Sequence, residues 1–299
     1  SDDDFWGIFK DLSTIGRGHF SKVKAIQHRT SDEAFAAKIL DKAAEEHDVE
    51  DLVREFSLMC KLDHPNIIKL YGAYETPRRL YLVMELATGG QLMARLAETD
   101  QKFYSEALVQ RHTRTILEAI AYMHSQKCSH RDLKPENVLL SSSKQDATIK
   151  IVDLGLSRVY ENDKAMQTVC GTHMYLAPEL VHCDRGDLVG YDMSVDLWGV
   201  GLLAFIMLHG FNPFSRSTQL ATHEAIVACD WSFPTGYNVS EVARDFLKST
   251  IRANPAERLT AAEALKHPWF AAEVTGALRN DASEAGQSMR HKTVAADPK

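Results

Sequence analysis

The stretch His130-Arg131-Asp132-Leu133-Lys134-Pro135-Glu136-Asn137, followed shortly by Asp153-Leu154-Gly155, is the most informative part of the chain. It brings together a candidate general base (Asp132), a cation (Lys134) and two oxygen-bearing side chains (Asn137 and Asp153). Magnesium takes oxygen ligands from carboxylates and amides. A phosphoryl transfer needs such ligands, together with an acceptor for the proton of the attacking hydroxyl. The stretch therefore predicts the active centre of a phosphoryl-transfer enzyme.

A glycine-containing turn lies upstream, in Gly16-Arg17-Gly18-His19-Phe20-Ser21-Lys22-Val23. Glycines let a backbone come close to phosphates, so that its N–H groups can point at them. Taken alone the turn has little specificity, and Ser21 stands where a third glycine is usual. A dinucleotide-binding fingerprint would need a helix directly after the turn, whereas 21–27 reads as a strand. A Walker loop would need the string Gly-Lys-Ser/Thr, which this turn lacks. A metabolic nucleotide-binding enzyme on either fold is therefore disfavoured.

Lys38 stands alone in the apolar segment Ala36-Ala37-Lys38-Ile39-Leu40. A lysine in an apolar strand is costly unless it is paired. Glu55, on the helix expected to follow, is the obvious partner, although Glu46 and Glu50 compete for that role. The alternative is an edge-strand lysine whose head group is solvated. The glycine turn and the 130–137 loop favour the paired lysine.

The apolar pattern divides the chain into a strand-rich first part and a helical second part. Up to Met84, apolar residues alternate with polar ones in short segments, and beyond Thr88-Gly89-Gly90 they recur at helical spacing. Expected strands cover 9–15, 22–27, 34–40, 67–74 and 80–86, with one helix over 49–61; expected helices then cover 105–126, 194–208, 240–251 and 260–266. The residues 271–299 carry few large apolar groups and are expected to form a mobile tail.

Together these features resemble the catalytic domain of eukaryotic protein kinases, from about Phe9 to Phe270. The resemblance implies an α+β, bilobal protein-kinase fold, with a small antiparallel-sheet N-lobe containing one main helix and a larger, mainly helical C-lobe. It divides the chain into an N-terminal extension (1–8), the N-lobe (9–86), the C-lobe (87–270) and a flexible tail (271–299). Two further motifs fit: the Glu of Ala177-Pro178-Glu179 is expected to pair with Arg258, and Asp196 is expected to anchor the catalytic loop.

The resemblance also implies roles for the matching residues, with ATP and Mg²⁺ as cofactors. Asp132 would accept or orient the substrate hydroxyl, and Lys134 would neutralise the transferring phosphoryl group. Asn137 and Asp153 would bind Mg²⁺, while Lys38, paired with Glu55, would hold the α- and β-phosphates. Val23 and Ala37 would cover the adenine and Leu139 would form its floor. The full set of expected nucleotide contacts is Ile15, Gly16, Gly18, Val23, Ala37, Lys38, Met84, Glu85, Ala87 and Leu139.

Regulation by phosphorylation is expected from Arg131, which directly precedes Asp132. We expect a buried positive charge at this position. Protein kinases with such an arginine often need a phosphate on the activation segment to pair with it and to order that segment. Thr168, three residues before Gly171, has the spacing of the acceptor, and an upstream kinase would be the partner that modifies it. The alternative is an unmodified surface threonine.

Within the protein kinases, the chain resembles the calcium/calmodulin-dependent group in His64-Pro65-Asn66-Ile67, Tyr175-Leu176-Ala177-Pro178-Glu179-Leu180 and Leu265-Lys266-His267-Pro268-Trp269-Phe270. Lys134, two residues after the candidate base, fits serine/threonine kinases better than tyrosine kinases. The expected partners are therefore protein or peptide substrates with serine or threonine acceptors. Glu136 matches one acidic reader of a substrate arginine, but the neutral Gln91 stands where a second is typical. A calmodulin-binding helix is not visible in this sequence.

Composition restricts the remaining function classes. The chain has 34 basic and 41 acidic residues, a net charge of −7, which argues against nucleic acid as the main partner. Five scattered cysteines without a CxxC pair indicate free thiols, and no apolar run is long enough to cross a bilayer, so a cytoplasmic or nuclear protein is expected. A pseudokinase scaffold is the alternative function. It is disfavoured because Lys38, Asp132 and Asp153 are all present.

Overall fold

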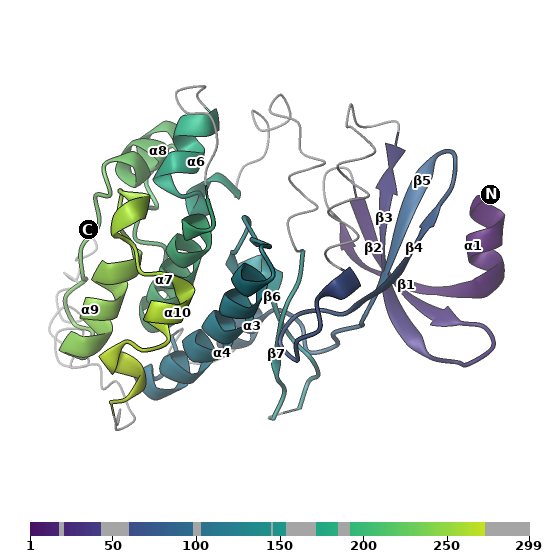
Figure 1. Ribbon diagram of the computed structural model, residues 1–299, viewed down its shortest axis with the longest axis horizontal. Helices are drawn as coiled ribbons and strands as arrows, with labels where there is room; N and C mark the ends of the chain where they lie inside the picture. Colours follow the sequence, from purple (N-terminus) through teal and green to yellow (C-terminus); the bar gives the residue numbers. More distant parts are fainter. Residues whose placement is uncertain are drawn as a thin grey trace, which may run out of the picture.

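The computed structural model describes residues 1–17, 21–42, 60–97, 103–144, 146–153, 172–184 and 192–272. Figure 1 shows two lobes, a strand-rich one that contains the N-terminus and a helical one, with the short β6–β7 pair between them. The predicted bilobal α+β fold is confirmed. The helix expected over 49–61 falls outside the described residues except for Cys60 and Lys61, which are helical, and the expected tail lies outside them beyond Ala272.

The small lobe is built on one antiparallel five-stranded sheet in the order β1-β2-β3-β5-β4. The strands agree with the expected segments within a few residues; they are β1 (Phe9–Arg17), β2 (Ser21–His28), β3 (Ala34–Asp41), β4 (Leu70–Glu75) and β5 (Arg79–Met84). β4 begins three residues later than expected because Ile67 instead forms a parallel bridge with Ile151 of β7, in the large lobe. This bridge already connects the two lobes.

Side chains alternate between the two faces of this sheet, as the pleat requires. The outer face carries a small apolar cluster, made of Phe5, Phe9, Ile26, Ala37, Tyr81 and Val83. The inner face carries Lys38 and its cross-strand partner Leu82. Leu82 belongs to the main core, which continues into the large lobe. The inner face of the sheet is therefore the one that meets the rest of the molecule.

A helix that the sequence did not predict, α1 (Asp2–Ile8), packs on the outer face at the end of the molecule opposite the helical lobe (Figure 1). Its Phe5 is 2% exposed and stacks on Tyr81, with ring centroids 4.1 Å apart. A seven-residue helix is marginal by itself in water. Burying Phe5 contributes about 2–3 kcal/mol, and each well-oriented aromatic pair about 0.5–1.5 kcal/mol more. Packing on the sheet therefore stabilises α1.

The large lobe is organised around α7 (Ser194–His209), whose residues from Val195 to His209 are all buried, as expected from its apolar run. Gly199 lets α7 approach the catalytic loop, because a Cβ there would lie 2.9 Å from Leu133 Cβ. The long helix α4 (Glu106–Ser125) packs against α7. The remaining elements are α3 (Leu92–Ala97), η2 (Pro135–Asn137), β6 (Val138–Leu140), β7 (Ile149–Ile151), η4 (Thr172–Tyr175), α6 (Pro178–Asp184), α8 (Gln219–Val227), α9 (Glu241–Thr250), η5 (Pro255–Glu257), α10 (Ala261–Ala264) and η6 (Pro268–Phe270).

None of the helices in the described part of the chain has both the length and the apolar character that a membrane span requires.

Candidate active site

Asp196, in the first turn of α7, holds the backbone of the loop that contains the candidate base. Its carboxylate is fully buried and accepts hydrogen bonds from the His130 N–H (2.9 Å), the Arg131 N–H (2.8 Å) and the Ser129 hydroxyl (2.9 Å). It also lies 2.8 Å from His124 Nε2. Burial alone would raise the pKa of this carboxyl, but His124, with smaller effects of His130 and the Arg131 N–H, holds the pKa below its usual value. The expected anchoring of the catalytic loop is therefore present.

Asp132, Lys134 and Asn137 lie together on this loop. Lys134 Nζ is 2.7 Å from Asp132 Oδ2. Asn137 Nδ2 donates to the Asp132 carbonyl (2.7 Å) and to its Oδ2 (3.1 Å). Pro135 begins the 3₁₀ turn η2, which brings the Asn137 side chain back towards Asp132. The orientation of the Asp132 carboxylate is thus set by one cation and one amide.

Asp153 meets Lys38 across the two lobes. Lys38 Nζ donates to Asp153 Oδ1 at 2.8 Å, and the lysine side chain is 7% exposed. Burial by itself would raise the pKa of the Asp153 carboxyl, but the Lys38 ammonium, with smaller effects of His130 and Lys134, lowers that pKa. Asp153 has a left-handed backbone, with φ of 58°. Such a conformation is uncommon for residues other than glycine.

A hydrogen-bond network joins the Asp132 and Asp153 segments. The His130 ring receives the Asp132 N–H at Nδ1 (3.3 Å), and its Nε2 donates to the Val152 carbonyl (2.9 Å). The Val152 N–H in turn donates to the Asn137 carbonyl at 3.0 Å. His130 is fully buried, so it is a structural histidine between the two segments. Both candidate carboxylates are consequently fixed to the same β6–β7 edge.

The expected nucleotide contacts are arranged in two groups. Val23 pairs across the sheet with Lys38 and also with Gly16, so these three residues lie in one row. Ile15, beside Gly16, is 49% exposed. At the other side of the site, Met84 ends β5 and packs partly on the main core. Ala87 follows in the connector, and Leu139 projects from β6 away from the core, between the buried Val138 and Leu140.

The structure contradicts the expectation that Ala37 covers the adenine, because Ala37 lies on the outer face of the sheet. It belongs to the outer-face cluster with Phe5 and Tyr81, on the opposite side of β3 from Lys38. Neighbouring residues of a strand point to opposite faces. Ala36, which pairs with Met84, therefore shares the inner face with Lys38.

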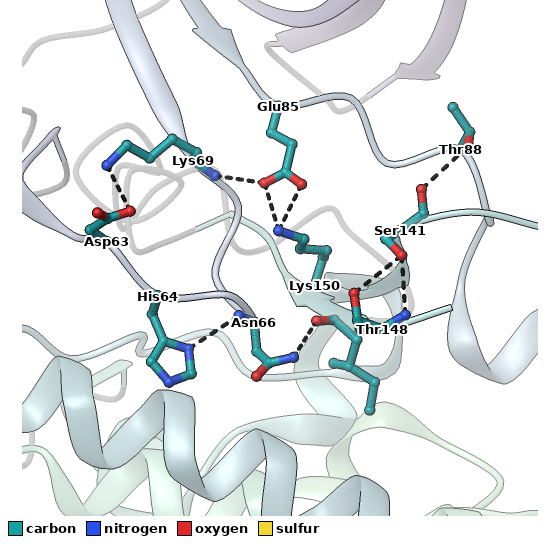
Figure 2. A network of polar contacts seen from close by, with 10 residues as sticks. Asp63, His64, Asn66, Lys69, Glu85, Thr88, Ser141, Thr148 and Lys150 are labelled. Atoms are coloured by element: carbon teal, nitrogen blue, oxygen red, sulfur yellow. Dashed lines mark hydrogen bonds and ion pairs between the residues drawn. The ribbon is translucent and has the colours of Figure 1, made fainter. Parts of the chain in front are cut away.

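The connector residue Glu85 has a second role that the sequence did not reveal. Its backbone N–H donates to the Lys69 carbonyl (2.8 Å), so this N–H already has a partner within the protein. Its carboxylate pairs with Lys150 of β7 at 2.7 Å and accepts the Lys69 N–H at 3.3 Å. Figure 2 shows the contact between Glu85 and Lys150. In addition, Asn66 Nδ2 donates to the Ile149 carbonyl at 2.9 Å. The connector and the 63–69 segment are thereby both fixed to β7.

The glycines after the connector make a further junction with the large lobe. The Gly89 N–H donates to the Leu140 carbonyl, and the Leu140 N–H donates to the Gly90 carbonyl, each at 2.9 Å. A Cβ at Gly89 would lie 2.2 Å from the Ser142 carbonyl oxygen, so only glycine fits there. Gln91 then bridges to Leu139 of β6.

The expected pair between Glu179 and Arg258 is present and buried. Arg258 donates to both carboxylate oxygens, at 2.6 and 2.7 Å, and its guanidinium lies 5.3 Å from the centre of the Trp198 ring. Such a two-pronged contact uses the planar geometry of arginine. It fixes the start of α6 to the large-lobe core.

Arg131 differs from expectation, since the residue is exposed and not buried. Its backbone has φ of 66°, its N–H donates to Asp196, and the residue lines the same cavity as Lys127.

Three expected site residues, Gly18, Glu55 and Thr168, lie outside the described residues.

Comparisons with known proteins agree with this geometry. A family model described as "Protein kinase domain" matches residues 9–270. The chain is 38% identical over 266 residues to "Myosin light chain kinase A" of Dictyostelium discoideum, covering 88% of each chain. It is 38% identical over 281 residues to "Calcium/calmodulin-dependent protein kinase type IV" of Mus musculus, covering 93% of this chain and 58% of that protein. It is 36% identical over 262 residues to "Calcium/calmodulin-dependent protein kinase type I" of Schizosaccharomyces pombe, covering 86% of this chain and 76% of that protein. The chain therefore belongs to the protein kinase family, as a serine/threonine kinase similar to the calcium/calmodulin-dependent group.

Proposed function

We propose that this kinase transfers the γ-phosphoryl group of ATP to serine and threonine hydroxyls of protein substrates. The observation that supports it most is the fixed relation between the two segments that contain Asp132 and Asp153, through His130, Val152 and Asn137. Positioning and charge neutralisation supply most of the catalysis in phosphoryl transfer, so a rigid arrangement of these groups is what the reaction needs.

In the proposed reaction Asp132 accepts or orients the proton of the substrate hydroxyl. Lys134, 2.7 Å from Asp132 Oδ2, lies where it can neutralise the charge of the transferring phosphoryl group. Lys38, which pairs with Asp153, would also hold the α- and β-phosphates, because an ammonium forms charge-assisted hydrogen bonds with phosphate as well as with carboxylate oxygens. Each of these roles belongs to a side chain that other contacts already orient.

Asn137 and Asp153 fit a magnesium site. Asn137 uses its Nδ2 to donate to Asp132, which leaves its amide oxygen for a cation. Asp153 offers Oδ2, since Oδ1 accepts from Lys38. Oxygen ligands of this kind are the ones that Mg²⁺ selects, and a bound Mg²⁺ would neutralise phosphate charge.

The test is incorporation of labelled phosphate from ATP into a serine/threonine peptide library. We expect phosphoserine and phosphothreonine as products. We expect turnover to fall by several orders of magnitude in Asp153→Asn, because Mg²⁺ then loses a carboxylate ligand. Nucleotide binding without transfer by the wild-type protein would favour a pseudokinase scaffold instead. Phosphotyrosine as the main product would contradict the proposed acceptor.

Substrate selection is proposed to depend only weakly on an arginine three residues before the acceptor. Glu136 is exposed and can meet a guanidinium, but the exposed Gln91 offers no charge for a second bond. A positional-scanning peptide library measures this preference, with Gln91→Glu as the matched variant. Stringent arginine selection by the wild-type enzyme would contradict the proposal.

Activation by phosphorylation of Thr168 is the proposed regulation. Its support is Arg131, an exposed cation in the catalytic loop next to Asp132, because a phosphate can form charge-assisted hydrogen bonds with an arginine. We expect Thr168→Ala to lower turnover severalfold or more. Equal turnover by fully phosphorylated and fully dephosphorylated enzyme would contradict this regulation.

A further inference from the structure

The helix α1 precedes the residues that match the kinase family, which begin at residue 9. It nevertheless packs closely on the small lobe. Phe5 stacks on Tyr81 at 4.1 Å and meets Tyr74 edge-on at 5.4 Å. Phe9, the first residue of β1, completes the aromatic contact with Phe5 at 5.0 Å. This chain therefore supplies its own cover for the outer face of the sheet.

Polar contacts fix the first turn of α1 to the hairpin between β4 and β5. Asp2 Oδ2 lies 2.9 Å from Arg79 Nη1, and the Thr76 hydroxyl donates to Asp2 Oδ1 at 2.8 Å. The hydrogen bond from Thr76 and the charge of Arg79 lower the pKa of the Asp2 carboxyl, with the hydrogen bond the larger cause. Asp2 therefore attaches the helix to the strand pair β4–β5.

The last turn of α1 is fixed to β2 and to the turn that follows it. The Arg29 guanidinium donates to the Trp6 carbonyl, and the Arg29 N–H donates to the Ile8 carbonyl, each at 3.0 Å. Lys24 Nζ lies 5.6 Å from the centre of the Trp6 ring. Together with the Asp2 contacts, these interactions link β2 to the β4–β5 hairpin through α1.

The strands that α1 covers are those that place the expected nucleotide contacts. Tyr81 of β5 pairs with Ile39 of β3, and the next pair along these strands is Leu82 with Lys38. Tyr81 and Lys38 thus lie on opposite faces of the same strand pair, one beneath α1 and the other in the active site. A shift of β3 against β5 would move both.

We propose that α1 is a positioning segment for the nucleotide site, with Phe5 as its positioning residue. Docked α1 holds the β3–β5 pair in the arrangement that presents Lys38 to the phosphates. Because coupling between two sites is reciprocal, bound nucleotide also strengthens the docking of α1. The inference rests on the proposed function, since its readout is nucleotide binding.

The experiment compares the full chain with its Phe5→Ala variant, at a temperature well below both melting transitions. Affinity for Mg-ADP is measured by calorimetry, and KM for ATP and kcat by peptide phosphorylation. We expect affinity to fall by about fivefold or more, the lower range of typical coupling between sites. As the affinity falls, KM for ATP should rise. We expect kcat to be unchanged, because Phe5 lies on the outer face of the sheet, opposite the face that carries Lys38.

Phe103→Ala is the matched control, because Phe103 is also buried but packs beside Tyr237 in the large lobe. It should lower the melting temperature and leave Mg-ADP affinity unchanged. Equal affinity of Phe5→Ala and wild type would overturn the inference while leaving the proposed function intact. Absence of Mg-ADP binding by the wild-type chain would overturn both.

A second measurement needs no substitution and covers the case in which Phe5→Ala does not fold. Hydrogen–deuterium exchange of residues 2–9 is followed in the wild-type chain with and without saturating Mg-ADP. Slower exchange with nucleotide supports the coupling. Unchanged exchange overturns it.

Discussion

At the scale of single residues, Asp132 is held from three directions. Its N–H donates to His130, its carbonyl accepts from Asn137, and its carboxylate pairs with Lys134. The first two contacts use its backbone, so they persist when its side chain changes. Substitution at Asp132 therefore tests the chemistry of the carboxylate with little disturbance of the loop.

Asp132→Asn keeps the size of the side chain and removes the carboxylate that we propose as the proton acceptor. We expect kcat to fall by about a hundredfold to ten-thousandfold, the usual contribution of a positioned general base. Nucleotide affinity should change little, because Lys38 and Asp153 remain. Single-turnover phosphorylation and calorimetry with Mg-ADP measure the two quantities. Asp146→Asn, at an exposed position, is the control. Retained kcat in Asp132→Asn would show that Asp132 is not the base.

At the scale of elements, β6–β7 is the junction between the lobes. β7 contacts the connector through the ion pair between Lys150 and Glu85. It also contacts the segment that leads into the small lobe, because the Ile151 N–H donates to the Asn66 carbonyl at 2.8 Å. The Lys150 and Glu85 side chains are 12% and 27% exposed. An ion pair at this depth is screened less by water than a surface pair. We therefore expect it to contribute measurably to stability.

A double-mutant cycle with Lys150→Met and Glu85→Gln measures that contribution. We expect a coupling free energy of roughly 1–2 kcal/mol in urea unfolding, because each single change leaves a partly buried partner unpaired. The exposed pair Arg252–Glu257 provides the matched cycle, for which about 0.5 kcal/mol or less is expected. Equal coupling in the two cycles would show that the junction does not depend on this ion pair.

The same elements show what could be read from the sequence. Lys38 is recognisable from the sequence as a lone lysine in an apolar strand, and Lys150, between Ile149 and Ile151, carries the same signal. Strand alternation excludes Ala37 from the face of the sheet that carries Lys38. The partner of Lys150 could not be predicted, because Glu85 reaches it through the tertiary arrangement of the connector. Local pattern thus identifies strands and charged outliers, whereas partners across lobes require the fold.

At the scale of the whole molecule, two apolar clusters differ in what local sequence reveals. The main core runs from the inner face of the sheet into the helical lobe, and its helices follow clear apolar periodicity. The outer cluster depends on Phe5 of α1, a helix too short to be predicted from eight residues. The apolar periodicity of the long helices therefore made the bilobal fold predictable, whereas the packing of α1 on the outer face of the sheet could not be predicted.

Buried histidines make the stability of the whole molecule depend on pH. Burial lowers the pKa of His209 and that of His112 to about 4. His209 is buried, stacks on Phe205 at 4.1 Å and donates from Nδ1 to the Phe205 carbonyl. In the unfolded chain a histidine titrates near pH 6.5. Between pH 6.5 and 4 the unfolded chain therefore binds more protons, and the free energy of unfolding decreases as pH falls.

For His209 alone this linkage lowers the free energy of unfolding by about 1.5 kcal/mol between pH 6.5 and 5. The lowered pKa of Asp196 acts in the same direction but at lower pH, since its stabilisation is lost only as pH falls below its ordinary value of 3.8. Histidines therefore dominate between pH 7 and 5. Urea unfolding at pH 7, 6 and 5 should show a smaller loss of stability in His209→Phe than in the wild type, because phenylalanine keeps the stacking but binds no proton. Parallel losses in the two proteins would mean that His209 is already protonated in the fold.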